Sequence, residues 1–247
     1  MNRMVALWAH PRSRSTVLER VFIERKDFEV FHEPFAHVAF NQDSSIPSDN
    51  LACGLPTTYE GVKALLREAR QQHAVFHKDM CYHCLAELKA DPAFLLEQDN
   101  IFIIREPLSS IRSHFAIYPQ MPRDAIGHKA QYEVFCEVTR LTGRIPYVIN
   151  ADDLVHSPET TVRQLCDHLQ LPFMPQALSW NQECPTQWLP WRSWHKAAEQ
   201  STHIHSTHHS PINDTVVNSD SRLIGYYRFH RPYYERMNQF TKGLGLT

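Results

Sequence analysis

The chain is poor in glycine, and none of its seven glycines lies in the basic loop that follows the first apolar run. This loop, residues 10–16 (His-Pro-Arg-Ser-Arg-Ser-Thr), lacks the G-x-x-x-x-G-K-[ST] pattern of an ATP-binding P-loop, including its lysine. Kinases and ATPases of that class depend on the lysine and on a metal-binding hydroxyl at fixed places. The missing residues therefore disfavour that class of enzyme.

Long hydrophobic runs are also missing from the chain. No stretch approaches the ~18 apolar residues that span a bilayer, and the first apolar run, residues 4–9, is too short for the apolar region of a signal peptide. We therefore expect a cytoplasmic protein with no membrane partner.

A strong net charge is missing too, because the chain has 25 Lys and Arg residues and 27 Asp and Glu residues. General nucleic-acid binders are usually basic, so we expect no nucleic-acid partner. The six cysteines are scattered, and Cys81 with Cys84 forms a lone C-x2-C pair. This pair, and the histidines at 203, 205, 208 and 209, lack the spacing or partners of a zinc site, so no metal is predicted.

Strand-like and helix-like segments alternate along the first ~170 residues. Short apolar runs at 28–31, 74–76, 100–104 and 145–149 join residues 4–9 as predicted strands. Helical patterns separate them, at residues 17–22, 59–71, 85–96 (broken by Pro92), 108–118, 124–141 and 158–169, the last with Ser157 as its N-cap. This alternation predicts one three-layer α/β/α domain over residues 1–247, with a central parallel sheet.

The pattern fades after Pro172. Residues 176–222 are rich in Trp, His, Gln and Ser with little periodicity, which favours an irregular C-terminal lid or substrate loop. Residues 41–58 are predicted to be a surface loop, and 223–244 a closing helix.

Ligands of parallel α/β sheets bind outside the carboxyl ends of the strands. The predicted strands place residues 12–16, Glu33, Lys78, Arg105 and Asp152 at that edge. The loop before the first helix can hold a phosphate-like group through backbone N–H groups, hydroxyls and guanidiniums. Arg105 with Ser113, eight residues on, can hold a second anion, so the pattern indicates a ligand with two separated phosphates.

Three segments carry a resemblance to a known family. Residues 11–16 resemble the 5′-phosphosulfate loop, and residues 104–113 the 3′-phosphate motif, of sulfotransferases that use 3′-phosphoadenosine-5′-phosphosulfate (PAPS). Residues 152–173 are similar to the segment that follows the fourth strand in that family. The resemblance implies a P-loop-containing nucleoside triphosphate hydrolase-like fold, with PAPS as sulfuryl donor and 3′-phosphoadenosine-5′-phosphate (PAP) as product, and no metal.

The resemblance also implies roles for individual residues. Arg12 would contact the transferred sulfuryl group, and Glu33 would act as general base, with His32 and His10 as alternatives. The 3′-phosphate would contact Arg105 and Ser113. The 5′-phosphate loop would consist of Arg12, Ser13, Arg14, Ser15 and Thr16, with Arg14 at a position where the family prefers glycine.

The adenine partner is not evident, because Val17 stands where many members have a stacking Trp. Trp188, Trp191 and Trp194 are candidates for this stacking. The acceptor is expected to be a small molecule with a hydroxyl or amine, contacted by His32, Trp191, Trp194 and His195. A nucleotide-dependent phosphotransferase and a noncatalytic nucleotide-binding module remain alternative interpretations, and the oligomeric state stays open.

Overall fold

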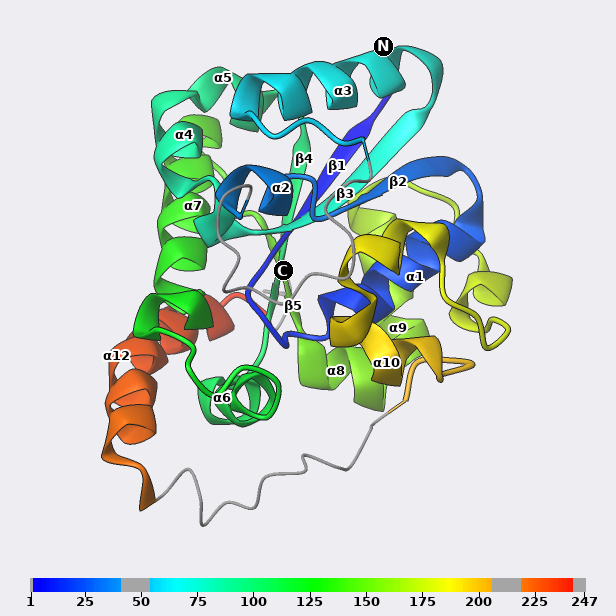
Figure 1. The fold of residues 1–247 in the computed structure, drawn as a ribbon. Coiled ribbons are helices and arrows are strands. Elements are labelled where there is room, and N and C mark those ends of the chain that lie inside the picture. The colour runs from blue at the N-terminus through cyan, green and yellow to red at the C-terminus, as the bar shows by residue number, and fades with distance from the viewer. Residues whose placement is uncertain (1, 41–53, 206–218, 242–247) are drawn as a thin grey trace, which may run out of the picture.

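A five-stranded sheet forms the centre of the computed structural model, which describes residues 2–40, 54–205 and 219–241 (Figure 1). Every strand pairing is parallel, and the strand order is β2-β3-β1-β4-β5. The α/β fold with a parallel sheet is therefore confirmed. The strands are β1 (Met4–Ala9), β2 (Phe28–His32), β3 (Ala74–Met80), β4 (Asp99–Ile104) and β5 (Tyr147–Asn150).

Alternating side chains of β1 feed two hydrophobic cores, one on each face of the sheet. Val5 and Leu7 pack in the first core, and Ala6 and Trp8 in the second. Helices α1 (Ser15–Arg25), α8 (Ala151–His156) and α9 (Pro158–His168) cover the first face. The second face is covered by α3 (Tyr59–Gln72), α4 (Leu85–Ala90), α5 (Pro92–Leu96), α7 (His128–Thr142) and α12 (Ser221–Asn238).

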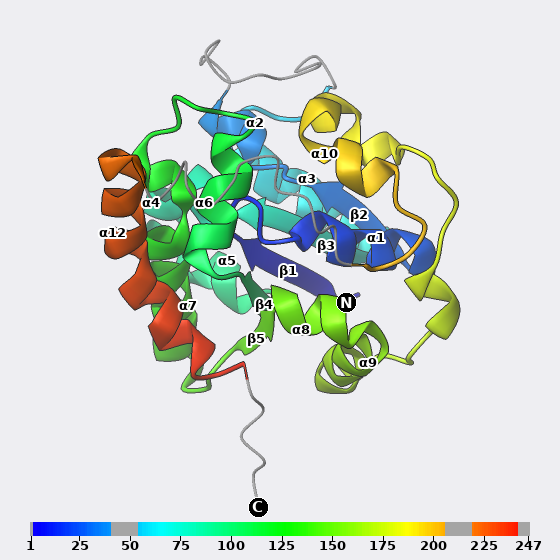
Figure 2. The same cartoon turned by 90° about the horizontal axis from the view of Figure 1, so that it is seen from below.

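Three helices stand near the carboxyl ends of the strands: α2 (Ala36–Ala39), α6 (Pro107–Phe115) and α10 (Arg192–Glu199). Figure 2 shows α6 and α10 on opposite sides of the loop that joins β1 to α1. This arrangement builds the walls of a site around that loop.

Four local predictions differ from the structure. β3 continues through residues 77–79, because these polar side chains are buried and paired inside the protein. The helix expected over 124–141 is divided into a 3₁₀ turn and α7 by Gly127, whose φ of 87° ends the turn. Ser157 makes no side-chain cap of α9. Helix α8, which was not predicted, has Asn150 as its N-cap, and the Asn150 side chain accepts the Asp152 N–H at 2.8 Å.

The predicted lid is partly helical. Short 3₁₀ turns at Pro175–Leu178 and Thr186–Trp191 precede α10, and Trp188 and Trp191 bury their rings there. Burial of these rings fixes a segment whose composition suggested irregular chain. The predictions for 41–53 and 206–218, including His208 and His209, lie outside the described residues. Among the described residues, no helix is long and apolar enough to cross a membrane.

Gln131 in α7 ties the two central strands together. Its side chain is fully buried, and its Nε2 donates to the carbonyls of Trp8 and Ile103 at 3.0 and 2.8 Å. These carbonyls lie two residues before His10 and Arg105, where both strands enter the site. A single amide therefore bridges the two strands just before they enter the site.

Replacing this amide should destabilise the protein. Gln131→Leu removes the hydrogen bonds that this amide donates to two carbonyls, and we expect the free energy of unfolding to fall by about 1–3 kcal/mol. Urea denaturation followed by circular dichroism measures the change. Gln72→Leu, at an exposed position of α3, is the matched control, and an equal effect of both variants would contradict the role of the amide.

Candidate active site

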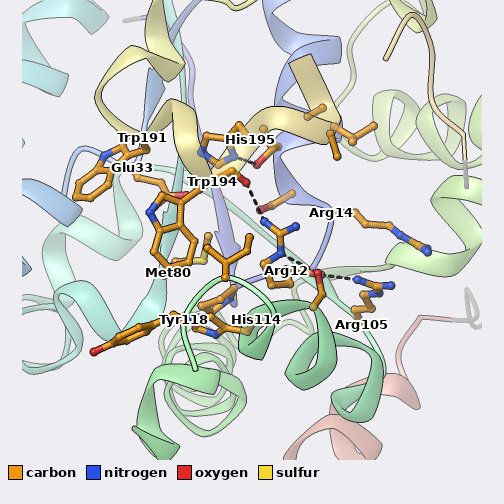
Figure 3. Close-up of a pocket in the computed structure, with 18 of the residues that line it drawn as sticks. Arg12, Arg14, Glu33, Met80, Arg105, His114, Tyr118, Trp191, Trp194 and His195 are labelled. Atoms are coloured by element: carbon orange, nitrogen blue, oxygen red, sulfur yellow. Dashed lines mark hydrogen bonds between the residues drawn. The ribbon is translucent and has the colours of Figure 1, made fainter. Parts of the chain in front are cut away.

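A cavity of about 910 Å³ opens at the carboxyl ends of the strands, beside the loop after β1 (Figure 3). It brings together most of the residues expected from the sequence, but Ser13 and His32 do not line it and lie buried behind its wall. The lining includes Arg12, Arg14, Ser15, Thr16, Glu33, Arg105, Ser113, Trp191, Trp194 and His195.

The loop reaches α1 through two left-handed residues, Arg12 at φ 63° and Arg14 at φ 64°. Helix α1 then begins with neither a side-chain cap on its N-cap residue nor an acidic residue in its first turn. Its unpaired N–H groups and dipole therefore favour an anion at this end. The backbone thus has a conformation suited to an anion cradle without the usual glycine, and its binding of an anion stays a prediction.

Arg14 occupies a glycine-like conformation, and its side chain turns away from the cradle (Figure 3). Its Nη1 donates to Asp152 Oδ1 at 2.6 Å and to the Ala151 carbonyl at 3.0 Å. A left-handed conformation costs a residue with a Cβ about 1–2 kcal/mol. The contacts to α8 offset part of this cost and keep the side chain from filling the loop.

The two predicted anion sites adjoin each other. Arg12 Nε donates to Ser113 Oγ at 2.9 Å, and Arg105 Nη1 donates to the Arg12 carbonyl at 3.0 Å. Arg12 also reaches α10 through the Trp194 carbonyl, 2.9 Å from its Nη1. Arg105 Nε and Ser13 Oγ are buried without a hydrogen-bond partner among the described residues. Such unpaired donors are costly unless a ligand engages them.

Positive charge is concentrated in this region. Burial, together with the nearby guanidiniums of Arg14 and Arg12, lowers the pKa of Arg105 to about 10. Asp152 and Glu106 only partly oppose this effect. A bound polyanion would relieve the repulsion, so the electrostatics favour an anionic ligand.

Both ring nitrogens of His10 are already engaged by neighbouring backbone groups. Its Nε2 accepts the Arg105 N–H at 3.0 Å, and its Nδ1 contacts the Pro11 carbonyl at 3.0 Å. Burial lowers its pKa to about 3, so the ring is neutral near pH 7. His10 thus positions Arg105, and the geometry argues against it as a general base.

Glu33 lies at a sharp turn after β2 and faces the cavity. Its φ is 47°, its N–H donates to the Lys78 carbonyl at 2.7 Å, and its carboxylate pairs with the Lys78 ammonium at 2.5 Å. Asp79 fixes the turn by accepting the Phe35 N–H at 2.7 Å. Burial opposes ionisation of Glu33, but Lys78, with smaller contributions from nearby histidines that include His32, outweighs burial and holds the pKa of Glu33 well below the usual value.

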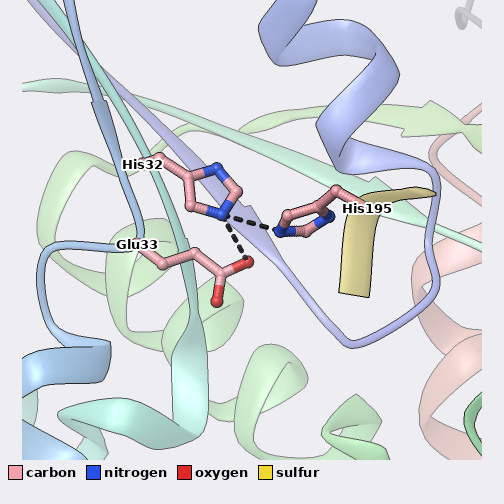
Figure 4. Close-up of side chains that lie close together, drawn as sticks. All are labelled: His32, Glu33 and His195. Carbon is pink, nitrogen blue, oxygen red and sulfur yellow. Dashed lines mark hydrogen bonds and ion pairs between the residues drawn. The ribbon is translucent and has the colours of Figure 1, made fainter. Parts of the chain in front are cut away.

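Two histidines stand next to Glu33 (Figure 4). His32 Nδ1 lies 2.7 Å from Glu19 Oε2, and His32 Nε2 lies 2.9 Å from His195 Nε2. Burial lowers the pKa of His32 to about 3 and that of His195 well below its usual value. Both rings are therefore neutral near pH 7.

This group also has the spacing of a metal site, because donor atoms of His32, Glu33 and His195 lie within 4.8 Å of one another. The facing ring nitrogens are already hydrogen-bonded to each other, and Glu33 is paired with Lys78. An ammonium this close to the carboxylate opposes a cation. That the protein needs no metal stays a prediction.

The tryptophans divide into core and cavity residues. Trp188 is 1% exposed and does not line the cavity, so the prediction that it could stack on adenine is wrong. Trp191 contacts the rings of His37 and Phe40, and Trp194 lies edge-on to His114 at 5.8 Å. The last two tryptophans remain candidates because both line the cavity.

Cys81, Cys84, His203 and His205 do not belong to the one group of described residues with metal-ligand spacing. Cys81 and Cys84 are free, buried thiols, and burial raises the pKa of both. His203 and His205 are exposed, with ring centroids 4.9 Å apart.

Sequence reasoning missed Glu19 and gave Lys78 no role. Both are fully buried, with Glu19 in α1 and Lys78 in β3. A signal existed for Glu19, because it shares a helical face with Ser15 and Phe22, which are also buried. A carboxylate on the buried face of a helix needs a specific partner.

Comparisons with known proteins agree with this geometry. The model of a family described as "Sulfotransferase domain" matches residues 2–239. A solved sulfotransferase from Alicyclobacillus acidocaldarius has a similar fold, with a TM-score of 0.53 at 11% identity, covering 98% of this chain and 96% of the other.

Two curated Arabidopsis thaliana proteins are also similar. "Branched-chain-amino-acid aminotransferase-like protein 2" is 28% identical over 88% of this chain, and protein 1 of the same name is 30% identical over 79%. The matched segments span 39% and 35% of those proteins. Their names thus describe proteins more than twice as long as the part that matches.

The left-handed loop yields a stability test at Arg14. Arg14→Ala and Arg14→Gly both lose the contacts to α8, but alanine keeps the backbone strain that glycine removes. We expect the glycine variant to be more stable than the alanine variant by about 1 kcal/mol, as measured by urea denaturation. At exposed Glu68 in α3 the order should reverse, and alanine as the better residue at both positions would contradict the interpretation.

Proposed function

Because the chain belongs to the sulfotransferase domain family, we propose that it transfers a sulfuryl group from PAPS to a hydroxyl or amine of a small molecule. The observation that carries this proposal is the group of partly buried cations at the start of α1. Arg12 and Arg105 line the cavity there, and Arg105 Nε has no hydrogen-bond partner among the described residues.

The residues present fit a ligand with two phosphate groups. The N–H groups of the first turn of α1, with Ser15 and Thr16, would hold the 5′-phosphate side. Arg105 and Ser113 would hold the 3′-phosphate. Because Arg12 touches both segments, it would neutralise charge at their junction.

The same groups serve an in-line transfer. PAPS supplies the sulfuryl group, and negative charge grows on the leaving 5′-phosphate as the acceptor attacks. Arg12 and the backbone donors of α1 are already fixed in place, so they stabilise this charge without reorganising. Charge stabilisation of this kind needs no metal.

Glu33 is the proposed general base. It lines the cavity, and its ion pair with Lys78 keeps it ionised and ready to accept the acceptor's proton. His32 lies behind it, with its nitrogens bonded to Glu19 and His195. The neutral His32 ring packs 3.7 Å from the Glu33 carboxylate. Because Glu33 lines the cavity and His32 does not, Glu33 is the residue that would contact the acceptor.

The acceptor would occupy the aromatic part of the cavity. Phe40, Tyr118, Trp191 and Trp194 line it, and His195 lies at its edge with the cradle. This lining supports a partly apolar small molecule. The free thiols among the described residues, including Cys81 and Cys84, support a reducing setting such as the cytoplasm.

Binding of PAP tests the site assignment. We expect the wild-type protein to bind PAP in a calorimetric titration, and Arg12→Ala and Arg105→Ala each to weaken binding at least about tenfold, since each removes a charged donor. Arg140→Ala, on the exposed side of α7, should bind as the wild type does. Failure of the wild type to bind PAP would contradict the sulfotransferase proposal. Unchanged affinity in both arginine variants would contradict the assignment of Arg12 and Arg105 to the nucleotide site.

Transfer of labelled sulfate from PAPS tests the base. Glu33→Gln should bind PAP but lose about 10²–10⁴-fold in kcat, because the amide cannot take a proton. Exposed Glu29→Gln in β2 is the control. The low pKa of Glu33 means that it stays ionised as pH falls to about 5, so kcat/KM should show no acid limb above that pH. An acid limb near pH 6 or an undiminished rate of Glu33→Gln would rule out Glu33 as base.

A further inference from the structure

Glu19 is a buried carboxylate without full charge compensation. Its side chain is inaccessible to solvent, its Oε2 contacts His32 Nδ1, and the Trp188 indole N–H faces the carboxylate, although no well-formed hydrogen bond from the described residues reaches Oε1. The Lys78 ammonium is 3.9 Å from Glu19, but it pairs closely with Glu33. Two carboxylates thus share one ammonium, and this favours a proton on one of them.

The surroundings indicate which carboxylate takes the proton. Burial, reinforced by the charge of Glu33, raises the pKa of Glu19 to about 8, although Lys78 opposes the shift. Glu33 is held ionised by Lys78. Near pH 8, Glu19 therefore exists in both protonation states.

A row of hydrogen bonds connects Glu19 to the phosphate cradle. It runs from Glu19 to His32 at 2.7 Å, from His32 to His195 at 2.9 Å (Figure 4), and from His195 Nδ1 to Thr16 Oγ1 at 3.4 Å. The row joins α1, β2 and α10, and returns to the first turn of α1. Its two rings are neutral, so each carries one N–H hydrogen.

One hydrogen per ring allows only two consistent directions for the row. With Glu19 ionised, His32 donates to Glu19, His195 donates to His32, and the Thr16 hydroxyl donates to His195. With the proton on Glu19 Oε2, each bond reverses: Glu19 donates to His32, His32 to His195, and His195 to the Thr16 oxygen. The protonation state of Glu19 thus decides whether the Thr16 hydroxyl donates its hydrogen to His195 or is free to donate it elsewhere.

The two directions offer different groups to a ligand. An anion in the cradle needs donors, and the Thr16 hydroxyl can donate to it only when His195 donates to Thr16. We propose that Glu19 is a positioning residue that takes up a proton when the nucleotide binds, and so turns the Thr16 hydroxyl toward the 5′-phosphate. This inference rests on the proposed function, because it takes Thr16 as a contact of that phosphate.

The sign of the pH dependence follows from the groups that face Glu19. These are His32 and Glu33 from the end of β2, Lys78 from β3, and His195 from α10 through His32. A bound anion adds negative charge and raises the proton affinity of Glu19. Nucleotide affinity should therefore be greatest where Glu19 is protonated and should fall as pH rises through about 8.

Calorimetry with PAP tests the linkage in the wild-type protein. Titrations near pH 8 in two buffers of different ionisation enthalpy give the number of protons taken up, and we expect about half a proton per PAP. Between about pH 7 and 9, the affinity should fall about tenfold. The phosphates of PAP are fully ionised in this range, so they do not supply the effect.

Variants separate this role from a structural one. Glu19→Gln keeps the shape and its hydrogen bonds but cannot ionise, so it should bind PAP with no proton uptake and with pH-independent affinity. Glu29→Gln should retain the wild-type uptake. Thr16→Val cuts the row at its other end and should bind PAP more weakly, also without uptake, which keeps a test available if Glu19→Gln does not fold.

The outcomes also distinguish this inference from the function beneath it. PAP binding to the wild type without proton uptake near pH 8 would overturn the role of Glu19 and leave the sulfotransferase proposal standing. Uptake that persists in Glu19→Gln would overturn it as well. Failure of the wild type to bind PAP would overturn the proposed function, and the role of Glu19 with it.

Discussion

The parallel register of the sheet is the constraint on which the site depends. Because all five strands run in one direction, their carboxyl ends meet at one edge. Segments as far apart in sequence as the loop at Arg12, the turn at Glu33 and the strand end at Arg105 therefore share one cavity. Gln131 bridges the two central strands just before they enter it.

Charge organises this edge into two halves. On the β4 and β5 side, Arg12, Arg14 and Arg105 concentrate positive charge, relieved in part by Asp152. On the β2 and β3 side, Glu33 and Glu19 share Lys78, so this side lacks the excess of positive charge. A donor that is an anion and an acceptor that must lose a proton would find different environments within one cavity. This difference is consistent with a sulfotransferase that brings both substrates together.

The sequence was sufficient for features that depend on local pattern and chain order. The strand–loop–helix at residues 4–25, the strand before Arg105 and the position of Ser113 follow from apolar periodicity and turn residues, and all lie where they were expected. The β1–α1 loop and the α6 segment were predicted as separate anion sites. Their direct contact, Arg12 to Ser113, depends on a side chain crossing between elements and has no signature in the sequence.

Side-chain partners distant in sequence account for what could not be predicted. His195 reaches His32 across 163 positions, and no periodicity marks two histidines that will face each other. Glu19 was overlooked because a charged residue in an amphipathic helix is usually solvated. The helical order of 186–199 comes from rings of Trp188 and Trp191 packing against other segments, and residue composition alone does not show such packing.

The tether between Arg14 and Asp152 restricts how this loop can change over generations. A change at Asp152 alone would leave a strained arginine with one of its two contacts to α8 lost. A change from Arg14 to glycine would relieve the strain and make the carboxylate dispensable. The order of substitutions therefore matters: glycine at 14 opens a route to free variation at 152, whereas the reverse order passes through a less stable protein.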